Sequence, residues 1–183
     1  MSHTGIPNRK GTRLMVIDLQ GRLMPVIHEK ERLKKSVNTL IKGMEILRVP
    51  TLVTEQYPKG IGHTDAGIEL PENTKVFEKM CFSCMKDDHL LISEEIMGAT
   101  DLVLCGVEAH VCVLQTALDA VEKGLRVHVV ADAVSSRFEH NKILALERLC
   151  QSGVFIVSVE MILFQMMRES GNDEFRAISK LIK

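Results

Sequence analysis

The sequence lacks the features that mark several common classes of protein. It has no long block of Lys and Arg, and its 23 basic and 24 acidic residues give a formal net charge of −1. Its apolar runs all fall well short of the roughly 20 residues that a membrane-spanning helix needs. The polar start "MSHTGIPNRKGTR" has no apolar segment of the kind found in secretory signals. These absences predict a protein without a nucleic-acid partner and without a membrane partner.

Motifs for nucleotides and metals are missing as well. Neither GxGxxG nor GxxxxGK[ST] occurs, so no glycine-rich loop is available to approach a phosphate. The seven histidines are scattered, without an HExxH or a Cys/His cluster. His63 and Asp65, in "GIGHTD", either share a metal or simply decorate a solvated loop. We expect no cofactor and no metal.

The cysteines number five, an odd count without the spacing of a disulfide framework. Such usage suits a reducing compartment and predicts a cytoplasmic protein, with a mitochondrial location as the alternative. Cys81 and Cys84 form a CxxC, but a redox role would require that pair to open a helix in a thioredoxin-like unit. We expect Cys105 and Cys150 to be small buried hydrophobic residues.

What the sequence does contain is a regular alternation of strand-like and helix-like segments. Its 183 residues, 45% of them hydrophobic, suit one domain with a sizeable core, spanning 1–183 with a flexible segment at 1–11. Alternation at these lengths predicts right-handed βαβ units. The expected fold is α/β: a three-layer Rossmann-like sandwich whose mostly parallel sheet has five to six strands, with helices on both faces. The strands are expected at 12–20, 49–57, 73–79, 99–106, 125–133 and 153–159, and the main helices at 29–48, 86–97, 110–123 and 139–151.

Ligands of such sheets bind beyond the carboxyl ends of the strands, and a cysteine lies at one of these ends. Cys112 follows the fourth strand, at about the first turn of the expected helix 110–123. Free amides and the helix dipole there favour negative charge, so the thiol is expected to ionise more easily. A thiolate attacks carbonyl carbon. The competing interpretation is a buried cysteine that only fills space.

A nucleophile needs a base, and the sequence offers two candidates for that role. His110 lies two residues from Cys112, where side chains on a helix point in different directions, so we expect it to be a wall or structural residue. Asp18 ends the first strand, and a carboxylate at the end of a buried strand requires a partner. Lys79, at the end of the third strand, could supply the opposite charge, although its residue type and position alone favour a surface lysine.

These blocks resemble the isochorismatase-like cysteine hydrolases, a family that includes nicotinamidases. The resemblance runs from "LMVIDLQ" through "TEQYPKGIG", "FEKMCFSC" and "GVEAHVCVLQTALDA" to "VVADAVSSR", and the middle blocks are most similar to the isochorismatase-domain-containing subgroup. It implies a catalytic triad of Asp18, Lys79 and Cys112. Asp18 would take the thiol proton, Lys79 would hold and tune that carboxylate, and Cys112 would form a thioester that water hydrolyses.

The resemblance also implies an oxyanion hole and further contacts. A cis peptide is expected between Val107 and Glu108, with the amides of Glu108 and Cys112 directed at the developing charge. Gln20 is expected to contact substrate. Tyr57 and Phe82 are expected to do so as well, although each could instead pack within the protein. The partners implied are a small-molecule substrate and further copies of the chain in a homo-oligomer.

The sequence departs from the family pattern in two places. Many relatives carry threonine where this chain has Ala109, which puts the usual substrate contacts in doubt. Nicotinamidases carry a D-x-H metal set after the second strand, where this chain has Glu55 and Tyr57. The sequence therefore predicts a metal-independent cysteine hydrolase of a small amide-type or carbonyl compound. The alternative, from another class, is a non-catalytic or thiol-sensing interaction protein that retains the fold.

Overall fold

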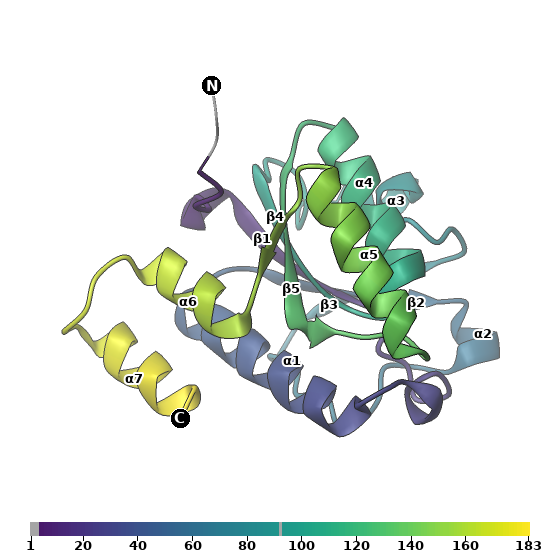
Figure 1. Ribbon diagram of the computed structural model, residues 1–183, viewed down its shortest axis with the longest axis horizontal. Helices are drawn as coiled ribbons and strands as arrows, with labels where there is room; N and C mark the ends of the chain where they lie inside the picture. The colour runs from purple at the N-terminus through teal and green to yellow at the C-terminus, as the bar shows by residue number, and fades with distance from the viewer. Residues whose placement is uncertain (1–3, 92) are drawn as a thin grey trace.

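A computed structural model describes residues 4–91 and 93–183 of the chain. Its middle layer is a six-stranded sheet in the order β3-β2-β1-β4-β5-β6, and every neighbouring pair of strands is parallel (Figure 1). The strands are β1 (Thr12–Ile17), β2 (Thr51–Gln56), β3 (Lys75–Lys79), β4 (Asp101–Gly106), β5 (Arg126–Val134) and β6 (Phe155–Val157). The predicted parallel α/β sandwich is confirmed.

Helices cover both faces of this sheet (Figure 1). On one face lie α1 (Lys30–Ile46), α6 (Val159–Met167) and α7 (Asp173–Leu181), and on the other α3 (Asp88–Leu91), α4 (Leu114–Glu122) and α5 (Glu139–Gln151). Shorter pieces complete the chain: α2 (Pro58–Ile61), the 3₁₀ turns η1 (Arg9–Gly11), η2 (Met24–Val26) and η3 (Cys84–Lys86), and the π-helical turn η4 (Ala109–Val113).

The central strands are apolar on both faces because each face meets a helical layer. Leu14 and Val16 of β1 pack into the core beneath α1 and α6, whereas Met15 and Ile17 pack into the core beneath α4 and α5. Successive side chains of a strand point to opposite faces, so a strand between two layers is read as a continuous apolar run. The continuous apolar runs in the sequence therefore predict the positions of the central strands.

The helix expected over 86–97 is much shorter in the structure. Among the described residues of this range, α-helix is confined to α3, and turns occupy 94–97. The Ser93 hydroxyl and the Ser93 amide both donate to the carbonyl of Leu90, at 2.7 and 3.1 Å. A serine that bonds its hydroxyl to a nearby carbonyl competes with helical hydrogen bonding, and the chain tightens into a turn instead.

Asn8 and Arg9, near the start of the chain, contact distant parts of the fold. Residues 1–11 were expected to be flexible, and residues 1–3 lie outside the described residues. Arg9, however, donates to both carboxylate oxygens of Glu174 in α7, at 2.9 and 2.7 Å, and the Asn8 amide donates to Asp101 at 3.3 Å. These contacts connect the segment around η1 to α7 and to the start of β4.

No helix of the described chain has the length and apolar character required to cross a bilayer.

Candidate active site

The carboxyl ends of four neighbouring strands bring the polar residues of the site together. In the order β3-β2-β1-β4, Lys79 ends β3, Gln56 ends β2, Asp18 follows β1 and Cys112 lies in the turn after β4. Gln56 and Lys79 are register partners, and the Asp18 amide donates to the Thr54 carbonyl at 3.1 Å. Strand order reverses between β1 and β4, which is where open α/β sheets place their ligands.

Two backbone features at this reversal point fit the residue types found there. Asp18 has φ +52°, a left-handed conformation that aspartate tolerates better than most residues and that turns the chain out of β1. Gly106 ends β4 with φ +115°, and a Cβ atom on it would lie 2.0 Å from the carbonyl oxygen of Ile17. Only glycine lets β4 pass so close to β1 at this level.

Asp18 and Lys79 form a buried ion pair. The Lys79 Nζ lies 2.7 Å from Asp18 Oδ2, and the exposed fractions of the two side chains are 0% and 1%. The other carboxylate oxygen, Oδ1, accepts from the Thr54 hydroxyl at 2.8 Å. Burial raises the pKa of Asp18, and the nearby Lys79 charge only partly opposes that rise. Burial is the largest single influence on Lys79 and disfavours its ammonium, but Asp18 and the neighbouring Cys84 and Cys112 together outweigh it and raise the pKa of Lys79.

Gln56 fixes the direction of the Lys79 ammonium. Its Oε1 accepts from Lys79 Nζ at 2.8 Å, while its Nε2 donates to the Met80 carbonyl at 2.8 Å. Both ends of the amide are thereby engaged, so Gln56 holds one orientation. Gln56 and Thr54 were not predicted as site residues. Their position on a strand next to Asp18 was the available signal, but their contacts depend on register across strands.

The Cys112 thiol belongs to the same cluster. Hydrogen bonding between the thiol and Asp18 acts to lower the Asp18 pKa, and the charges of Asp18 and Lys79 both act on the thiol. Cys112 is 7% exposed. The structure thus brings Asp18, Lys79 and Cys112 together from three separate parts of the chain.

The expectation of an easily ionised Cys112 is corrected by its surroundings. Burial raises the pKa of the thiol, the Asp18 charge raises it further, and Lys79 compensates only in part. The π-helical turn η4 holds Cys112, and the regular helix α4 begins only at Leu114, so the residue lies before α4 rather than in its first turn. These surroundings favour the neutral form of the Cys112 thiol.

The turn around Cys112 carries the expected backbone geometry. The Val107–Glu108 peptide is cis. The Glu108 carbonyl accepts from the Val111 and Val113 amides at 3.0 and 3.3 Å, which closes the turn. Within residues 4–91 and 93–183, the amides of Glu108 and Cys112 donate to no carbonyl outside this helical turn. Both amides belong to the turn that carries the thiol.

Side chains near this turn have structural partners. The Glu108 carboxylate accepts from the Arg137 amide at 2.9 Å and from Arg137 Nε at 3.1 Å, so it is paired within the protein. His110 Nδ1 lies 3.0 Å from the Ser136 hydroxyl and its Nε2 lies 3.3 Å from Asn141 Nδ2. These contacts agree with a structural role for His110.

Gln20 is placed differently from the expectation of a substrate contact. It is fully buried, its Oε1 accepts from the Gln56 amide at 2.8 Å, and its Nε2 donates to the Gln56 carbonyl at 3.0 Å and also to the Gly62 carbonyl. Its amide is committed at both ends, which makes Gln20 a clamp between β1, β2 and the loop after α2. Tyr57 and Phe82 are 46% and 53% exposed at the same edge of the sheet, and their substrate contacts stay predictions.

The segment after β2 is stabilised without a metal-ligand cluster. Glu55 accepts from the amide and hydroxyl of Thr64, at 2.7 and 2.8 Å, and lies 2.9 Å from His63 Nδ1. Asp65 pairs instead with Lys34 at 3.0 Å. Among the described residues, no group of three or more His, Cys, Asp and Glu side chains is arranged to hold a metal ion. The HxD pair is thus split between two structural partners.

The remaining cysteines are all free thiols. Cys84 is buried beside the cluster, with its Sγ 3.8 Å from the Thr54 hydroxyl, and burial raises its pKa to about 11. Cys105 is buried, as expected. Cys150 is exposed, which corrects the sequence interpretation: α5 directs Ala145 and Leu149 to the core, and the next residue along a helix points elsewhere.

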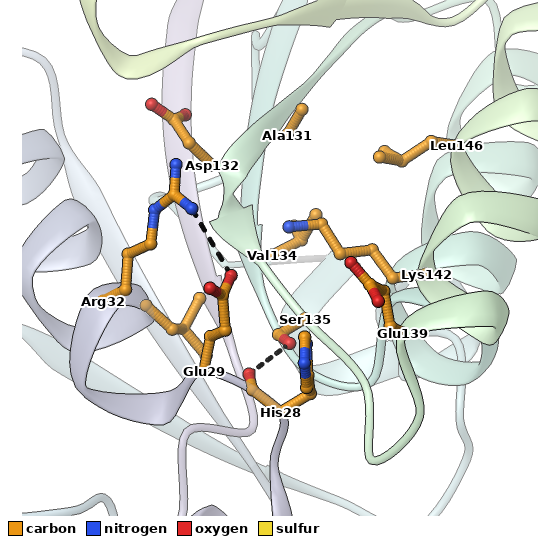
Figure 2. Close-up of a pocket in the computed structure, with 11 residues that line it drawn as sticks. His28, Glu29, Arg32, Ala131, Asp132, Val134, Ser135, Glu139, Lys142 and Leu146 are labelled. Carbon is orange, nitrogen blue, oxygen red and sulfur yellow. Dashed lines mark hydrogen bonds and ion pairs between the residues drawn. The ribbon is translucent and has the colours of Figure 1, made fainter.

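A pocket of about 340 Å³ lies at the same edge of the sheet, beside the end of β5. Figure 2 shows Glu29 and Arg32 on one side of it and Glu139 and Lys142, from α5, on the other. Asp18, Lys79 and Cys112 do not line it. Its Ser135 connects it to the active-site turn, because the Ser135 carbonyl accepts from the Ala109 amide at 2.7 Å. The pocket is therefore next to the turn that holds Cys112, but the thiol does not line it.

Comparisons with known proteins agree with this architecture. The family model "Isochorismatase domain" matches residues 12–161. A secreted isochorismatase effector, Isc1, of Phytophthora sojae is 41% identical over 93% of this chain and 83% of its own length. Isochorismatase domain-containing protein 2 of Danio rerio is 36% identical over 100% of this chain and 92% of its own. The solved structure of the MAR1 ribonuclease of Caenorhabditis elegans is 38% identical, covers 96% of this chain and 91% of its own, and superposes with a TM-score of 0.89. The chain belongs to the isochorismatase family.

Proposed function

We propose that this protein is a cysteine-dependent hydrolase of a small amide-type or carbonyl compound, acting through Asp18, Lys79 and Cys112. The observation that carries the proposal is the convergence of a thiol, a carboxylate and an ammonium from three strand ends in one buried cluster. The family's hydrolase fold supports the same conclusion.

The proposed reaction begins from the neutral thiol. As Cys112 Sγ adds to the carbonyl carbon, its proton passes to Asp18, whose raised pKa suits a base that must accept one from a thiol. Lys79 keeps the carboxylate ionised until then and stays in place through Gln56. The amides of Glu108 and Cys112 stabilise the oxyanion. The amine leaves with a proton from Asp18, and water then cleaves the thioester.

The raised pKa of Cys112 favours this function over thiol sensing. Redox-sensing cysteines are exposed and carry a low pKa, so that the thiolate is available to an oxidant. Cys112 is buried and its thiol holds its proton more tightly than an ordinary cysteine. Such a thiol reacts when a bound substrate and an adjacent base act on it together.

The relatives' names suggest other properties, which we weigh on this chain's own residues. The C. elegans structure carries the name ribonuclease, but a net charge of −1 gives an RNA backbone no electrostatic attraction. The Escherichia coli YcaC protein is described as an octameric hydrolase, and at 21% identity it shows the fold alone. We propose that this chain also forms a homo-oligomer, because Phe138, Ile143 and Leu144 are exposed around α5.

The compartment follows from the cysteines. We propose a reducing compartment, because all five thiols are free in the structure and three of them are buried.

A panel of small primary amides, with RNA as a separate arm, tests the proposed activity. We expect amide hydrolysis by the wild type and a loss of roughly 1,000-fold or more in kcat in Cys112→Ser, because the hydroxyl is a far weaker nucleophile. The Cys150→Ser variant, which changes an exposed cysteine, is the matched control and should keep full activity. Equal turnover by wild type and Cys112→Ser would refute the triad.

A further inference from the structure

Arg137 lies next to the candidate oxyanion hole and has donors to spare. It follows β5 and contacts Glu108 twice, through its amide and through Nε. Glu108 is the residue whose own amide would stabilise the oxyanion, and its carbonyl closes the turn that holds Cys112. The Arg137 guanidinium is therefore attached to the rim of the active-site turn.

The contact with Glu108 uses only one edge of the guanidinium. Within the described chain, both Nη atoms of Arg137 lack a hydrogen bond or ion pair, and the side chain is 52% exposed. The Nε edge is fixed on a carboxylate that is 10% exposed. A guanidinium held in this way presents its outer edge in a defined orientation, and that edge matches the two oxygens of a second carboxylate.

Other charged side chains of the site are not available in this way. Lys79 is fully buried and already binds Asp18 and Gln56. Glu108 is occupied by Arg137. Arg137 is thus an accessible cation held on Glu108, in the turn that also carries Cys112.

We propose that Arg137 is a specificity-determining residue that binds a carboxylate on the substrate, so that the preferred substrates are small amides bearing a carboxylate. This rests on the proposed function, since it assigns the substrate class of the same site. The guanidinium would hold the carboxylate while the amide carbonyl lies at the Cys112 thiol. A polar anchor of this kind discriminates strongly, because an analogue without the carboxylate leaves the site's donors unpaired.

The binding test uses the Cys112→Ser protein, so that it does not depend on turnover. The probes are the amido acids malonamate, succinamate and glutaramate, each compared by calorimetry with a neutral alkanamide of the same length. We expect at least one amido acid to bind about 10-fold tighter than its neutral counterpart, the size of effect that a charge-assisted hydrogen bond gives. Added Arg137→Met should abolish the difference, and Arg137→Lys should keep part of it.

The matched control is Arg148→Met, which removes an exposed arginine on α5. It should leave the preference unchanged. If no amido acid binds more tightly than its neutral counterpart, or if Arg137→Met keeps the preference, the assignment of Arg137 is wrong. The proposed function is tested separately: neutral amides hydrolysed in a Cys112-dependent way, without a carboxylate preference, would uphold the triad and overturn only this inference.

A second measurement compares two alkylating agents at Cys112 in otherwise wild-type protein. Iodoacetate is anionic and iodoacetamide is its neutral analogue, so their rate ratio reports the local preference for a carboxylate. We expect this ratio, followed by mass spectrometry of the Cys112 peptide, to fall about 10-fold in Arg137→Met and not in Arg148→Met. An equal ratio in the two variants would contradict the proposal.

Discussion

The carboxyl edge and the amino edge of the sheet each bury an aspartate beside a cation, but the pKa of the aspartate is raised at one edge and lowered at the other. At the carboxyl edge, Asp18 pairs with Lys79 and its pKa is raised, chiefly by burial. At the amino edge, Asp101 lies 2.7 Å from Arg126 and 3.3 Å from His128. Burial also acts on Asp101, but hydrogen bonds outweigh it and lower the pKa to about 2.

The number of donors explains the difference. Asp101 accepts from Arg126, His128, the Thr100 hydroxyl and the Asn8 amide, so its charged form is fully satisfied. Asp18 has two fixed donors, on Lys79 and Thr54, together with the thiol of Cys112. A carboxylate with saturated hydrogen bonding is an anchor, whereas one that retains capacity in a buried site can take up a proton. The same residue type is thus a structural tie at one edge and a candidate base at the other.

The largest expected effect comes from neutralising Asp18 and Asp101 in separate variants. Asp18→Asn should lower kcat/KM by roughly 100- to 10,000-fold, because the proton acceptor is lost. Asp101→Asn should keep near-wild-type kcat/KM but lose stability, because Arg126 keeps its charge without its partner. Kinetics and urea unfolding on the same samples separate the two outcomes. An active Asp18→Asn variant, or an inactive but stable Asp101→Asn variant, would break the comparison.

Acid should affect the two sites in opposite directions. The Asp101 pKa is lowered from 3.8 to about 2 in the folded protein, so its stabilising contribution is present above pH 3.8 and is lost as the pH falls toward 2. At about 1.4 kcal/mol for each pKa unit, that contribution is roughly 2 kcal/mol. Unfolding measured from pH 5 to pH 2 should therefore show a smaller loss of stability in Asp101→Asn than in the wild type.

Asp18 carries the reverse sign. A carboxyl group whose pKa is raised on folding binds its proton more readily in the folded state, so acid does not cost stability through that group. The acid-induced loss should therefore persist in Asp18→Asn. If both variants flatten the profile equally, the contrast between the two aspartates is wrong.

A smaller effect is expected at Gln56, which connects Lys79 to the backbone of the next residue. Gln56→Leu removes the oxygen that accepts from Lys79, so the lysine no longer holds one orientation. We expect kcat/KM to fall about 10-fold and the acidic side of its pH profile to shift. Gln56→Glu should restore the acceptor and part of the activity. The control Gln151→Leu changes an exposed residue of α5. An unchanged pH profile in Gln56→Leu would limit Gln56 to a purely structural role.

The sequence predicted the strands well and the short helical pieces poorly, for a physical reason. A strand between two helical layers, such as β1, must be apolar throughout, and that signal is local. The expected helix 86–97 is replaced after α3 by turns, in which the Ser93 hydroxyl donates to the Leu90 carbonyl, a local bond that competes with helical hydrogen bonding. Cys150 shows the same limit, since one residue of difference along α5 decides between core and solvent.

The sequence by itself determined the α/β fold and the edge of the sheet at which Asp18, Lys79 and Cys112 lie, because the carboxyl ends of parallel strands meet at one edge. The resemblance to a known family, and no local pattern, singled out Lys79. Only the tertiary structure decided the surroundings of the thiol and the hydrogen-bond partners of Gln20 and Gln56. Those properties depend on which strands are neighbours, on their register and on how deeply each group is buried. Neighbouring charges and desolvation set a pKa through space, and no local stretch of sequence encodes them.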